Sequence, residues 1–368
     1  MIPQRMAAVQ LTGYGGLERL EYRTDLPVPQ PGAGEVLIRV TAAGMNNTDI
    51  NTRVGWYSKS VRAGTTADAG RAGFGDERGG DSTWERAGLD FPRIQGADVA
   101  GRIVALGAGV PAARLGERVL VDPWIRDAAE PERRELAGYL GSERDGGYAQ
   151  YAAVPAVNAF PIASELGDAE LATFPCSYST GEYMLTRARL AEGETVLVTG
   201  ASGGVGSALV QLAKRRGARI IAVAGRDKMA AVEELGPDAV IARDSEHLIE
   251  EIRDAATGGA VDVAADIVGG EGFPGLLDLL DRGGRYVTSG AIAGPIVELD
   301  LRTLYLKDLE VIGATVMPRG IFAALVGYIE RGEVRPLLAR TFPLAELRDA
   351  QAAFLEKRHV GNFVVLPR

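Results

Sequence analysis

The glycine-rich run TGASGGVGS, residues 199–207, restricts the possible folds more than any other part of this chain. The apolar stretch TVLVT at 195–199 leads into it and predicts a buried strand, and residues 205–216 have the apolar spacing of a helix. A strand, a glycine-rich turn and a helix are how a βαβ unit begins. The spacing Gly200-x-x-Gly203-x-x-Gly206 is one residue longer than the strict G-x-G-x-x-G pattern.

Strands and helices continue to alternate over residues 190–315. Further strands are expected at 219–223, 239–241, 261–265, 285–289 and 309–313, and further helices at 227–235, 246–256 and 275–280. This alternation is typical of a parallel sheet with helices on both faces. It therefore predicts an α/β fold class, with a Rossmann domain whose parallel sheet is doubly wound.

The loop at the start of this series has the properties of a dinucleotide site. Gly200 allows the tight turn, Gly203 and Gly204 let the backbone approach a pyrophosphate, and Gly206 lets the helix pack on the sheet. The N–H groups and the positive end of the helix then hold the phosphates. A glycine-rich turn without a ligand is the competing interpretation, which the surrounding strand and helix disfavour. The loop residues expected to bind the cofactor are Gly200, Ser202, Gly203, Gly204 and Val205.

The end of the second strand favours NADPH over NADH. An NAD site needs Asp or Glu there to accept from the ribose 2′-hydroxyl, whereas this strand is followed by Gly225 and Arg226. Lys228 comes shortly after, and Arg243 follows the third strand. These three cations could neutralise a 2′-phosphate, although three solvated surface cations are the simpler alternative.

Residues 6–160 have the short strands and Pro/Gly turns of a β-rich unit. Strands are expected at 36–40, 101–106 and 118–122. The pattern of the C-terminal residues predicts helices at 321–331 and 344–357 and a last strand at 363–366. We expect this strand to return to the N-terminal β unit. The expected domains are a β-rich catalytic domain, 1–158 plus 327–368, and a dinucleotide-binding domain, 159–326.

Residues 61–88 interrupt this pattern. The segment is rich in Gly, Ala, Arg, Asp and Thr and has little apolar material to bury. We expect a long surface loop or partly disordered flap, which is either a tolerated surface insertion or an active-site lid.

Composition excludes several classes of protein and partner. The 368 residues carry 40 Lys+Arg and 49 Asp+Glu, a net charge of −9, which disfavours nucleic acid and anionic membranes as partners. No apolar run approaches the ~18 residues of a membrane-spanning helix. The single cysteine, Cys176, rules out an intramolecular disulfide and fits a cytoplasmic location.

Four motifs in order resemble the medium-chain dehydrogenase/reductase family, in particular its zinc-free quinone oxidoreductase and enoyl reductase branch. They are GMNNTDI at 44–50, GADVAG at 96–101, GGYAQY at 146–151 and the glycine loop. The resemblance implies that the β-rich domain is GroES-like, that the substrate lies between the two domains and that homodimers or homotetramers form. Zinc-dependent relatives place Cys at Asn46 and His-Glu at Ala97-Asp98, so that only Cys176 of the zinc ligands is kept. No bound metal is expected.

The same resemblance implies the roles of several other residues. The stretch NNTDINTRVGWY at 46–57 is similar to one in enoyl thioester reductases, which implies that Tyr57 donates the proton and Asn47 polarises the substrate. Tyr57 could instead be an aromatic wall of the substrate site. Thr180, Gly290 and Asn362 are expected near the cofactor.

The sequence therefore predicts an NADPH-dependent, metal-free oxidoreductase that transfers hydride to an activated C=C bond or a quinone as its small-molecule substrate. Hydrogen-bond donors can stabilise the conjugated oxygen that gains charge in such a reaction. The alternatives are a zinc-free alcohol or aldehyde dehydrogenase-like enzyme and a non-catalytic NADPH-binding protein.

Overall fold

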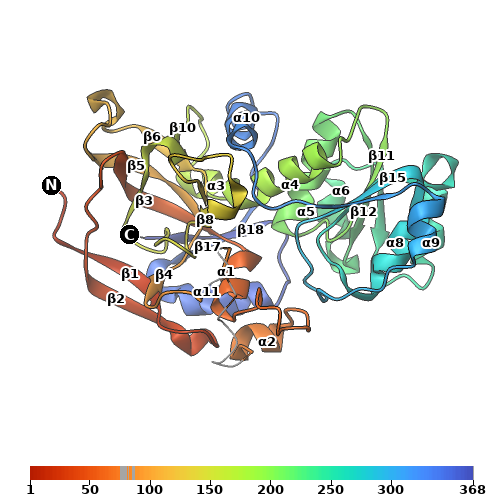
Figure 1. The fold of residues 1–368 in the computed structure, drawn as a ribbon, viewed down its shortest axis with the longest axis horizontal. Coiled ribbons are helices and arrows are strands. Elements are labelled where there is room, and N and C mark those ends of the chain that lie inside the picture. The colour runs from red at the N-terminus through yellow and green to blue at the C-terminus, as the bar shows by residue number, and fades with distance from the viewer. Residues whose placement is uncertain (75–80, 82, 85–87, 368) are drawn as a thin grey trace.

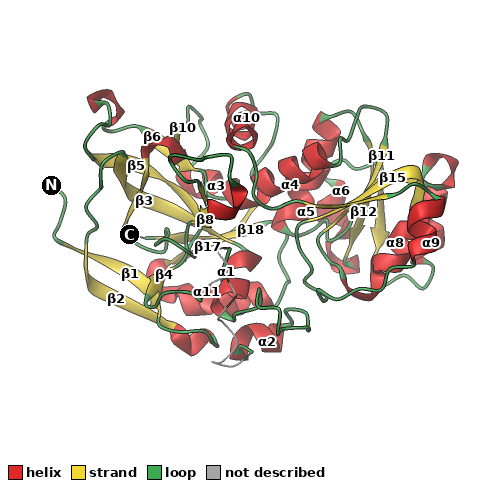
Figure 2. Ribbon diagram, viewed as in Figure 1, coloured by secondary structure: helices red, strands yellow, loops and turns green. Residues whose placement is uncertain are grey.

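A computed structural model describes residues 1–74, 81, 83–84 and 88–367. The chain forms a β-rich half, which contains both termini, and an α/β half; α4 and α10 lie between them (Figure 1). Strands dominate the first half, whereas helices cover a sheet in the second (Figure 2).

The α/β half contains one six-stranded parallel sheet with the order β13-β12-β11-β14-β15-β16. Its strands are β11 (Thr195–Val198), β12 (Arg219–Ala224), β13 (Ala239–Ala242), β14 (Val261–Asp266), β15 (Leu280–Thr288) and β16 (Glu310–Gly313). Its helices are α5 (Gly204–Arg215), α6 (Met229–Glu233), α7 (Leu248–Ala255), α8 (Phe273–Leu279) and α9 (Leu301–Leu306). The strand order reverses between β11 and β14, as in doubly wound sheets, which confirms the predicted fold class.

The β-rich half contains a seven-stranded sheet with the order β10-β6-β5-β3-β18-β17, in which β9 also pairs with β3. The strands are β3 (Glu35–Met45), β5 (Asp98–Leu106), β6 (Arg118–Val121), β9 (Tyr151–Pro155), β10 (Ala159–Pro161), β17 (Leu338–Pro343) and β18 (Asn362–Leu366). β18 pairs antiparallel with β3, placing Val364 opposite Gly44, which confirms that the last strand returns to the N-terminal unit.

Two small sheets and several helices complete this half. The order β2-β1-β4 joins β2 (Leu20–Pro27), β1 (Arg5–Leu11) and β4 (Arg93–Ile94), and β7 (Trp124–Ile125) pairs with β8 (Gly138–Tyr139). The helices of this half are α1 (Asn47–Arg53), α2 (Ala67–Ala72), α3 (Asp168–Leu171) and α11 (Leu347–Leu355), and the two helices between the halves are α4 (Pro175–Arg187) and α10 (Arg319–Glu330). A continuous apolar core joins the halves, because Ala42, Leu120, Phe174, Leu209 and Val364 belong to the same buried cluster.

The expectation of a loop with little to bury is wrong for the described part of residues 61–88. Residues 67–72 form α2, which begins at Thr66, whose side chain accepts from the Ala69 N–H. The backbone of Gly70 lies so close to α11 that an added Cβ would be 2.2 Å from a methyl group of Leu355. A residue without a side chain allows this close packing of α2 against α11. The low apolar content of the segment gives no sign of such a contact. Residues 75–80, 82 and 85–87 of the segment lie outside the described residues.

Among the described residues, no helix is both long enough and apolar enough to cross a membrane.

Candidate active site

The glycine loop lies at the carboxyl end of β11, beside the point where the strand order reverses. Gly200 has φ +59°, a left-handed conformation that favours glycine. Helix α5 begins at Gly204, and its N-cap residue, Gly203, has no side chain that could cap the first turn. The loop also meets the tail of the chain, because the Gly361 N–H donates to the Ser202 carbonyl at 3.0 Å. A helix start with free N–H groups at this sheet edge fits the phosphates of a dinucleotide.

Asn362 lies against the same loop from the β-rich half. It is 2% exposed, and its Nδ2 donates to Ser177 Oγ at 3.0 Å. A Cβ on Gly204 would lie 2.5 Å from Ser177 Oγ and 2.8 Å from Asn362 Nδ2, so Gly204 allows the two halves to approach closely here. The Oδ1 atom of Asn362 is buried without a partner among the described residues. An unsatisfied buried acceptor beside the glycine loop fits a hydrogen-bond donor of the cofactor.

Residues at the zinc-ligand positions of related enzymes form a hydrogen-bonded cluster. Asn46 Nδ2 donates to Asp98 Oδ2 at 3.0 Å, and the Cys176 N–H donates to Asp98 Oδ1 at 2.8 Å. Asn46 Oδ1 accepts from Ser177 Oγ at 3.2 Å. In this cluster Cys176 supplies one thiol and no residue supplies an imidazole, whereas a catalytic zinc site needs three protein ligands. These residues do not fit zinc, and no three His, Cys, Asp or Glu side chains of the described ranges are grouped to hold a metal ion.

Burial raises the pKa values of the acidic groups in and beside this cluster. Asp98 is fully buried, and burial together with the charge of Asp49 raises its pKa to about 8. Burial raises the pKa of Asp49 to about 6, against hydrogen bonds from the Asn46 N–H and the Tyr148 hydroxyl. Burial also raises the pKa of Cys176, so the thiol stays protonated at neutral pH. At neutral pH the negative charge therefore lies on Asp49, whereas Asp98 and Cys176 keep their protons and act as hydrogen-bonding groups.

We expect Asp98 to make the folding stability fall as the pH rises. The unfolded carboxyl loses its proton near pH 3.9, whereas the folded one keeps it until about pH 8, so the folded state binds more protons in between. In Asp98→Asn, the fall in unfolding free energy between pH 6 and 8 should be smaller than in the wild type by about 2 kcal/mol. Denaturant unfolding at both pH values measures this. Equal falls in both proteins would contradict a protonated Asp98.

Tyr57 lies after α1 in a group of aromatic rings. Its hydroxyl is hydrogen-bonded to Thr48 Oγ1 at 3.1 Å, and Asn51 is a second partner. Burial raises the pKa of Tyr57 to about 12, so the group keeps its proton at neutral pH. The ring centroid of Trp84 lies 5.0 Å from that of Tyr57. The structure thus gives Tyr57 both a proton to donate and an aromatic contact.

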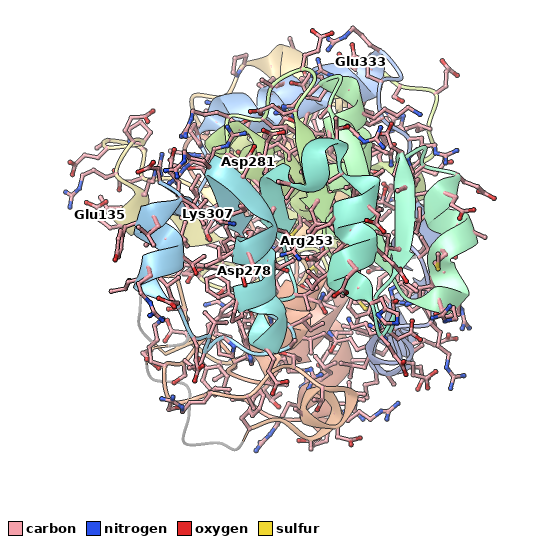
Figure 3. The ribbon with its side chains drawn as sticks, turned by 90° about the vertical axis from the view of Figure 1, so that its right-hand side faces the viewer. Glu135, Arg253, Asp278, Asp281, Lys307 and Glu333 are labelled. Atoms are coloured by element: carbon pink, nitrogen blue, oxygen red, sulfur yellow. The ribbon has the colours of Figure 1, made fainter. Side chains whose placement is uncertain are left out.

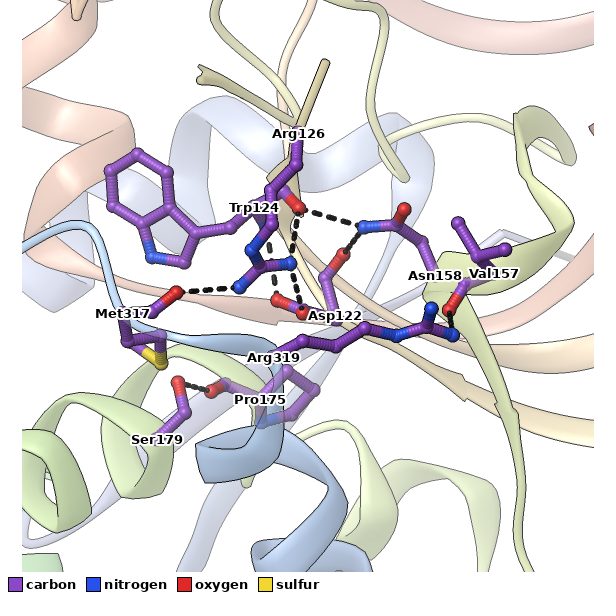
Figure 4. Close-up of polar contacts among 9 residues, drawn as sticks. All are labelled: Asp122, Trp124, Arg126, Val157, Asn158, Pro175, Ser179, Met317 and Arg319. Atoms are coloured by element: carbon purple, nitrogen blue, oxygen red, sulfur yellow. Dashed lines mark hydrogen bonds and ion pairs between the residues drawn. The ribbon is translucent and has the colours of Figure 1, made fainter. Parts of the chain in front are cut away.

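The aromatic group continues to the cysteine. Trp84 contacts Trp124, whose centroid lies 4.7 Å from that of Tyr139, and the hydroxyl of Tyr139 is hydrogen-bonded to Cys176. Arg126 holds this corner, because it donates to the Trp124 carbonyl at 3.0 Å and to the Met317 carbonyl at 2.7 Å (Figure 4). The apolar rings therefore form a wall that runs from Tyr57 to Cys176.

Four of the remaining predicted residues lie at separate places in the structure. Thr180 is on α4 and its hydroxyl is a second hydrogen-bonding partner of Cys176. Gly290 follows β15, and its carbonyl accepts from Thr288 Oγ1 at 2.9 Å. Arg226 lies beside Asp244, with 3.5 Å between Nη2 and Oδ1, in the turn after β12. Asn47 is turned toward the tail of the chain, and its Oδ1 accepts from Lys357 Nζ at 2.7 Å.

Several site residues were not predicted. Trp124 and Tyr139 come from the two short strands β7 and β8, and Trp84 comes from the inserted segment, so no local motif connects them. Lys357 is one of only five lysines in the chain, which was its only distinguishing feature in the sequence.

Comparison with known proteins agrees with the two halves. Residues 204–331 match the family model of the zinc-binding dehydrogenases, and residues 32–164 match that of the alcohol dehydrogenase GroES-like domain. An NAD-dependent alcohol dehydrogenase of Sulfolobus acidocaldarius is 29% identical, with 98% of this chain and 99% of that protein covered. A quinone oxidoreductase of Rattus norvegicus is 28% identical, with 98% and 97% covered.

A solved structure from Sinorhizobium meliloti 1021, assigned to the alcohol dehydrogenases, superposes with a TM-score of 0.88. It is 52% identical, and the match covers 100% of this chain and 98% of that one. Both domain models and this full-length match agree with the observed pair of a GroES-like domain and a Rossmann sheet. The chain therefore belongs to the medium-chain dehydrogenase/reductase family of oxidoreductases.

Proposed function

We propose that this oxidoreductase uses NADPH and no metal to reduce an activated C=C bond or a quinone. The observation that carries the proposal is the hydrogen-bonded cluster of Asn46, Asp98 and Cys176 at the zinc-ligand positions. Alcohol oxidation relies on a Lewis acid at the oxygen, whereas reduction of a conjugated system builds charge on an oxygen that hydrogen-bond donors can stabilise. The apolar wall between Tyr57 and Cys176 suits a flat, uncharged substrate.

The residues of this chain bind, orient and protonate the substrate. When bound, the reduced nicotinamide supplies the hydride. As the β-carbon of an enone gains it, the C=C electron pair moves toward the carbonyl oxygen, and one proton completes the reduction. Tyr57 is the donor we propose for that proton, since its hydroxyl is protonated at neutral pH and hydrogen-bonded to Thr48.

Two variants separate the proposed proton donor from an aromatic wall. Tyr57→Phe removes the hydroxyl and keeps the ring against Trp84, whereas Tyr57→Leu removes both. We expect Tyr57→Phe to lower kcat severalfold with a good enone, measured as NADPH oxidation, and Tyr57→Leu to lower it further. Unchanged turnover in Tyr57→Phe, with loss only in Tyr57→Leu, would assign Tyr57 to the wall.

NADPH is supported by the turn after β12, where Gly225 and Arg226 replace the carboxylate of an NAD site and Lys228 follows. The archaeal relatives are described as NAD-dependent, so the test compares both cofactors. Fluorescence titration should show tighter binding of NADPH than of NADH, and Arg226→Ala should reduce the difference. Equal affinities in the wild type would refute this choice of cofactor.

A zinc-free alcohol dehydrogenase-like activity is the second candidate, favoured by the description of the Sinorhizobium meliloti and Sulfolobus acidocaldarius proteins. One panel tests both candidates: quinones, enones and crotonyl thioesters with NADPH, and simple alcohols with NADP in the presence of a chelator. Turnover of the first set only supports the reductase. Intact NADPH binding without turnover on any of them would support a non-catalytic NADPH-binding protein.

Self-association is the last part of the proposal. β16 is an edge strand of the parallel sheet and presents the 48%-exposed Val311, and Leu301, Tyr305 and Leu306 of α9 are exposed beside it. Figure 3 views this end of the molecule, where α8 and α9 lie. We place the contact of a homodimer here, and the molar mass in solution tests it. The cytoplasmic location stays a prediction.

A further inference from the structure

A cluster of basic side chains lies where the tail of the β-rich half contacts the Rossmann half. Lys228, in the turn after β12, donates a hydrogen bond from Nζ to the carbonyl of Lys357, which follows α11. The ammonium group of Lys357 donates to Asn47 Oδ1 at 2.7 Å and lies 3.9 Å from the ring centroid of Phe354. Residues far apart in the sequence and from both halves thus meet here.

Within the described ranges, no ion pair joins Lys228, Lys357 or Arg243 to an acidic side chain. The carboxylate of Asp227 compensates part of the charge of Lys228 without pairing with it. Burial and the charge of Lys228 lower the pKa of Lys357 to about 7. Lys228 and Lys357 are half-buried and Arg243 is exposed. Lys228 repels both of the other cations, and a bound anion would relieve that repulsion.

The backbone conformation at Lys357 is one in which several helices of this chain end. Its φ is +52°, the left-handed conformation that usually falls to glycine just after a helix. Arg189 after α4 and Asp308 after α9 have the same left-handed conformation, with φ of +54° and +52°, at the same position after their helices. Glycine would fit the turn better, but it would remove the ammonium group from the cluster.

We propose that Lys357 is a phosphate ligand of the dinucleotide, which closes over the 2′-phosphate together with Lys228 and Arg243. Asn47 then acts as a positioning residue, which holds the Lys357 ammonium group toward the Rossmann half. This inference rests on the proposed NADPH function. The 2′-phosphate fits better than the pyrophosphate, because Lys228 and Arg243 follow β12 and β13 at the ribose corner, whereas the pyrophosphate belongs over the loop after β11.

The consequence is that both halves hold the cofactor phosphate. A 2′-phosphate bound between Lys228 and Lys357 would link the Rossmann half to the C-terminal turn of α11. NADH, which lacks this group, would bind without this link.

The test measures binding by calorimetry with four probes: NADPH, NADH, adenosine 2′,5′-bisphosphate and AMP. Lys357→Gly removes the ammonium group and suits the positive φ, so its thermal midpoint should not fall. We expect Lys357→Gly to raise the dissociation constants of NADPH and the bisphosphate by about tenfold or more, and those of NADH and AMP by less than about twofold. Lys357→Arg should retain most of the affinity for NADPH. Lys357→Gln, which keeps the aliphatic stem, replaces the glycine variant if that does not fold.

Arg358→Ala is the matched control, because the neighbouring cation is 84% exposed and lies beside Glu356. It should leave all four affinities unchanged. Asn47→Asp would place a carboxylate beside the ammonium group. It should lower the affinity for NADPH more than Asn47→Ala does, and it should leave the affinity for NADH unchanged. A structural role of Asn47 alone would weaken both cofactors equally.

Three results would overturn the inference. If Lys357→Gly lowered the affinities for NADPH and NADH equally, Lys357 would lie at the pyrophosphate. If it lowered neither affinity, Lys357 would not belong to the cofactor site. If Arg358→Ala lost the same affinity for NADPH and the bisphosphate, general surface charge would explain the effect of Lys357→Gly. A wild type that does not prefer NADPH would instead refute the proposed cofactor, whereas a preference that persists in Lys357→Gly refutes only the role of Lys357.

Discussion

Gly203→Ala is expected to lose dinucleotide binding and keep its folding stability. Gly203 has φ −80° and ψ 171°, which alanine adopts freely, and an added Cβ would have the Gly200 carbonyl oxygen as its nearest neighbour at 3.6 Å. Nothing in the folded protein therefore requires glycine at this position. A pyrophosphate over the loop does require it, because the backbone must approach the phosphates closely. We expect the dissociation constants of NADPH and NADH to rise by about tenfold or more in calorimetry.

Gly206→Ala is the contrasting variant, because there the protein itself excludes a side chain. Its Cβ would lie 2.1 Å from the Gly200 carbonyl oxygen and 2.8 Å from the Ala201 Cα, so backbone atoms would have to move. Overpacking of this kind costs about 1–3 kcal/mol, and the thermal midpoint should fall. If Gly203→Ala bound both cofactors as tightly as the wild type, the dinucleotide would not lie over this loop.

The sequence was sufficient for the Rossmann half because each of its elements has a local pattern. The predicted strands at 219–223 and 239–241 correspond to β12 and β13, since runs of Ile, Val and Ala fit a sheet covered on both faces. The predicted helix at 246–256 corresponds to α7, from Leu248 to Ala255. The glycine loop followed from its position between strand and helix.

Local patterns could not give the contacts between distant segments. Lys357 looks like any solvated lysine in the sequence, because its left-handed φ and its contacts with Asn47 and Lys228 depend on how α11 ends and where the Rossmann half sits. The resemblance implies that Asn47 polarises the substrate, which stays a prediction, and no local pattern shows that its carboxamide oxygen accepts from Lys357 Nζ. Contacts between polar residues that lie hundreds of residues apart therefore cannot be predicted from local sequence patterns.

The described part of the inserted segment illustrates the same point through Arg53. The side chain is fully buried, and it donates to Gln351 Oε1 at 2.9 Å, the Gly15 carbonyl at 2.7 Å and the Gly70 carbonyl at 2.6 Å. Burial lowers its pKa to about 10, so it stays charged at neutral pH. One guanidinium group thus ties α1, α2 and α11 together, and α2 belongs to the segment that composition assigned to the surface.

We expect Arg53→Met to cost about 3 kcal/mol of unfolding free energy, because it leaves three buried acceptors without donors. For a unit of about 200 residues, that loss lowers the thermal midpoint by roughly 6–12 °C. Hydrogen exchange should rise first in residues 67–72, whose Gly70 carbonyl loses its partner. Differential scanning calorimetry and exchange followed by mass spectrometry measure the two effects.

Arg348→Met is the control that separates burial from the number of hydrogen bonds. Arg348 also joins α11 to backbone carbonyls, those of Leu20 at 2.6 Å and Glu18 at 3.2 Å, but it is exposed. Water can replace its hydrogen bonds, so its loss should cost less than about 1 kcal/mol. If the two variants lost equal stability, burial would not be what makes Arg53 important, and α2 would be held to the catalytic domain by its other contacts, such as the packing of Gly70 against Leu355.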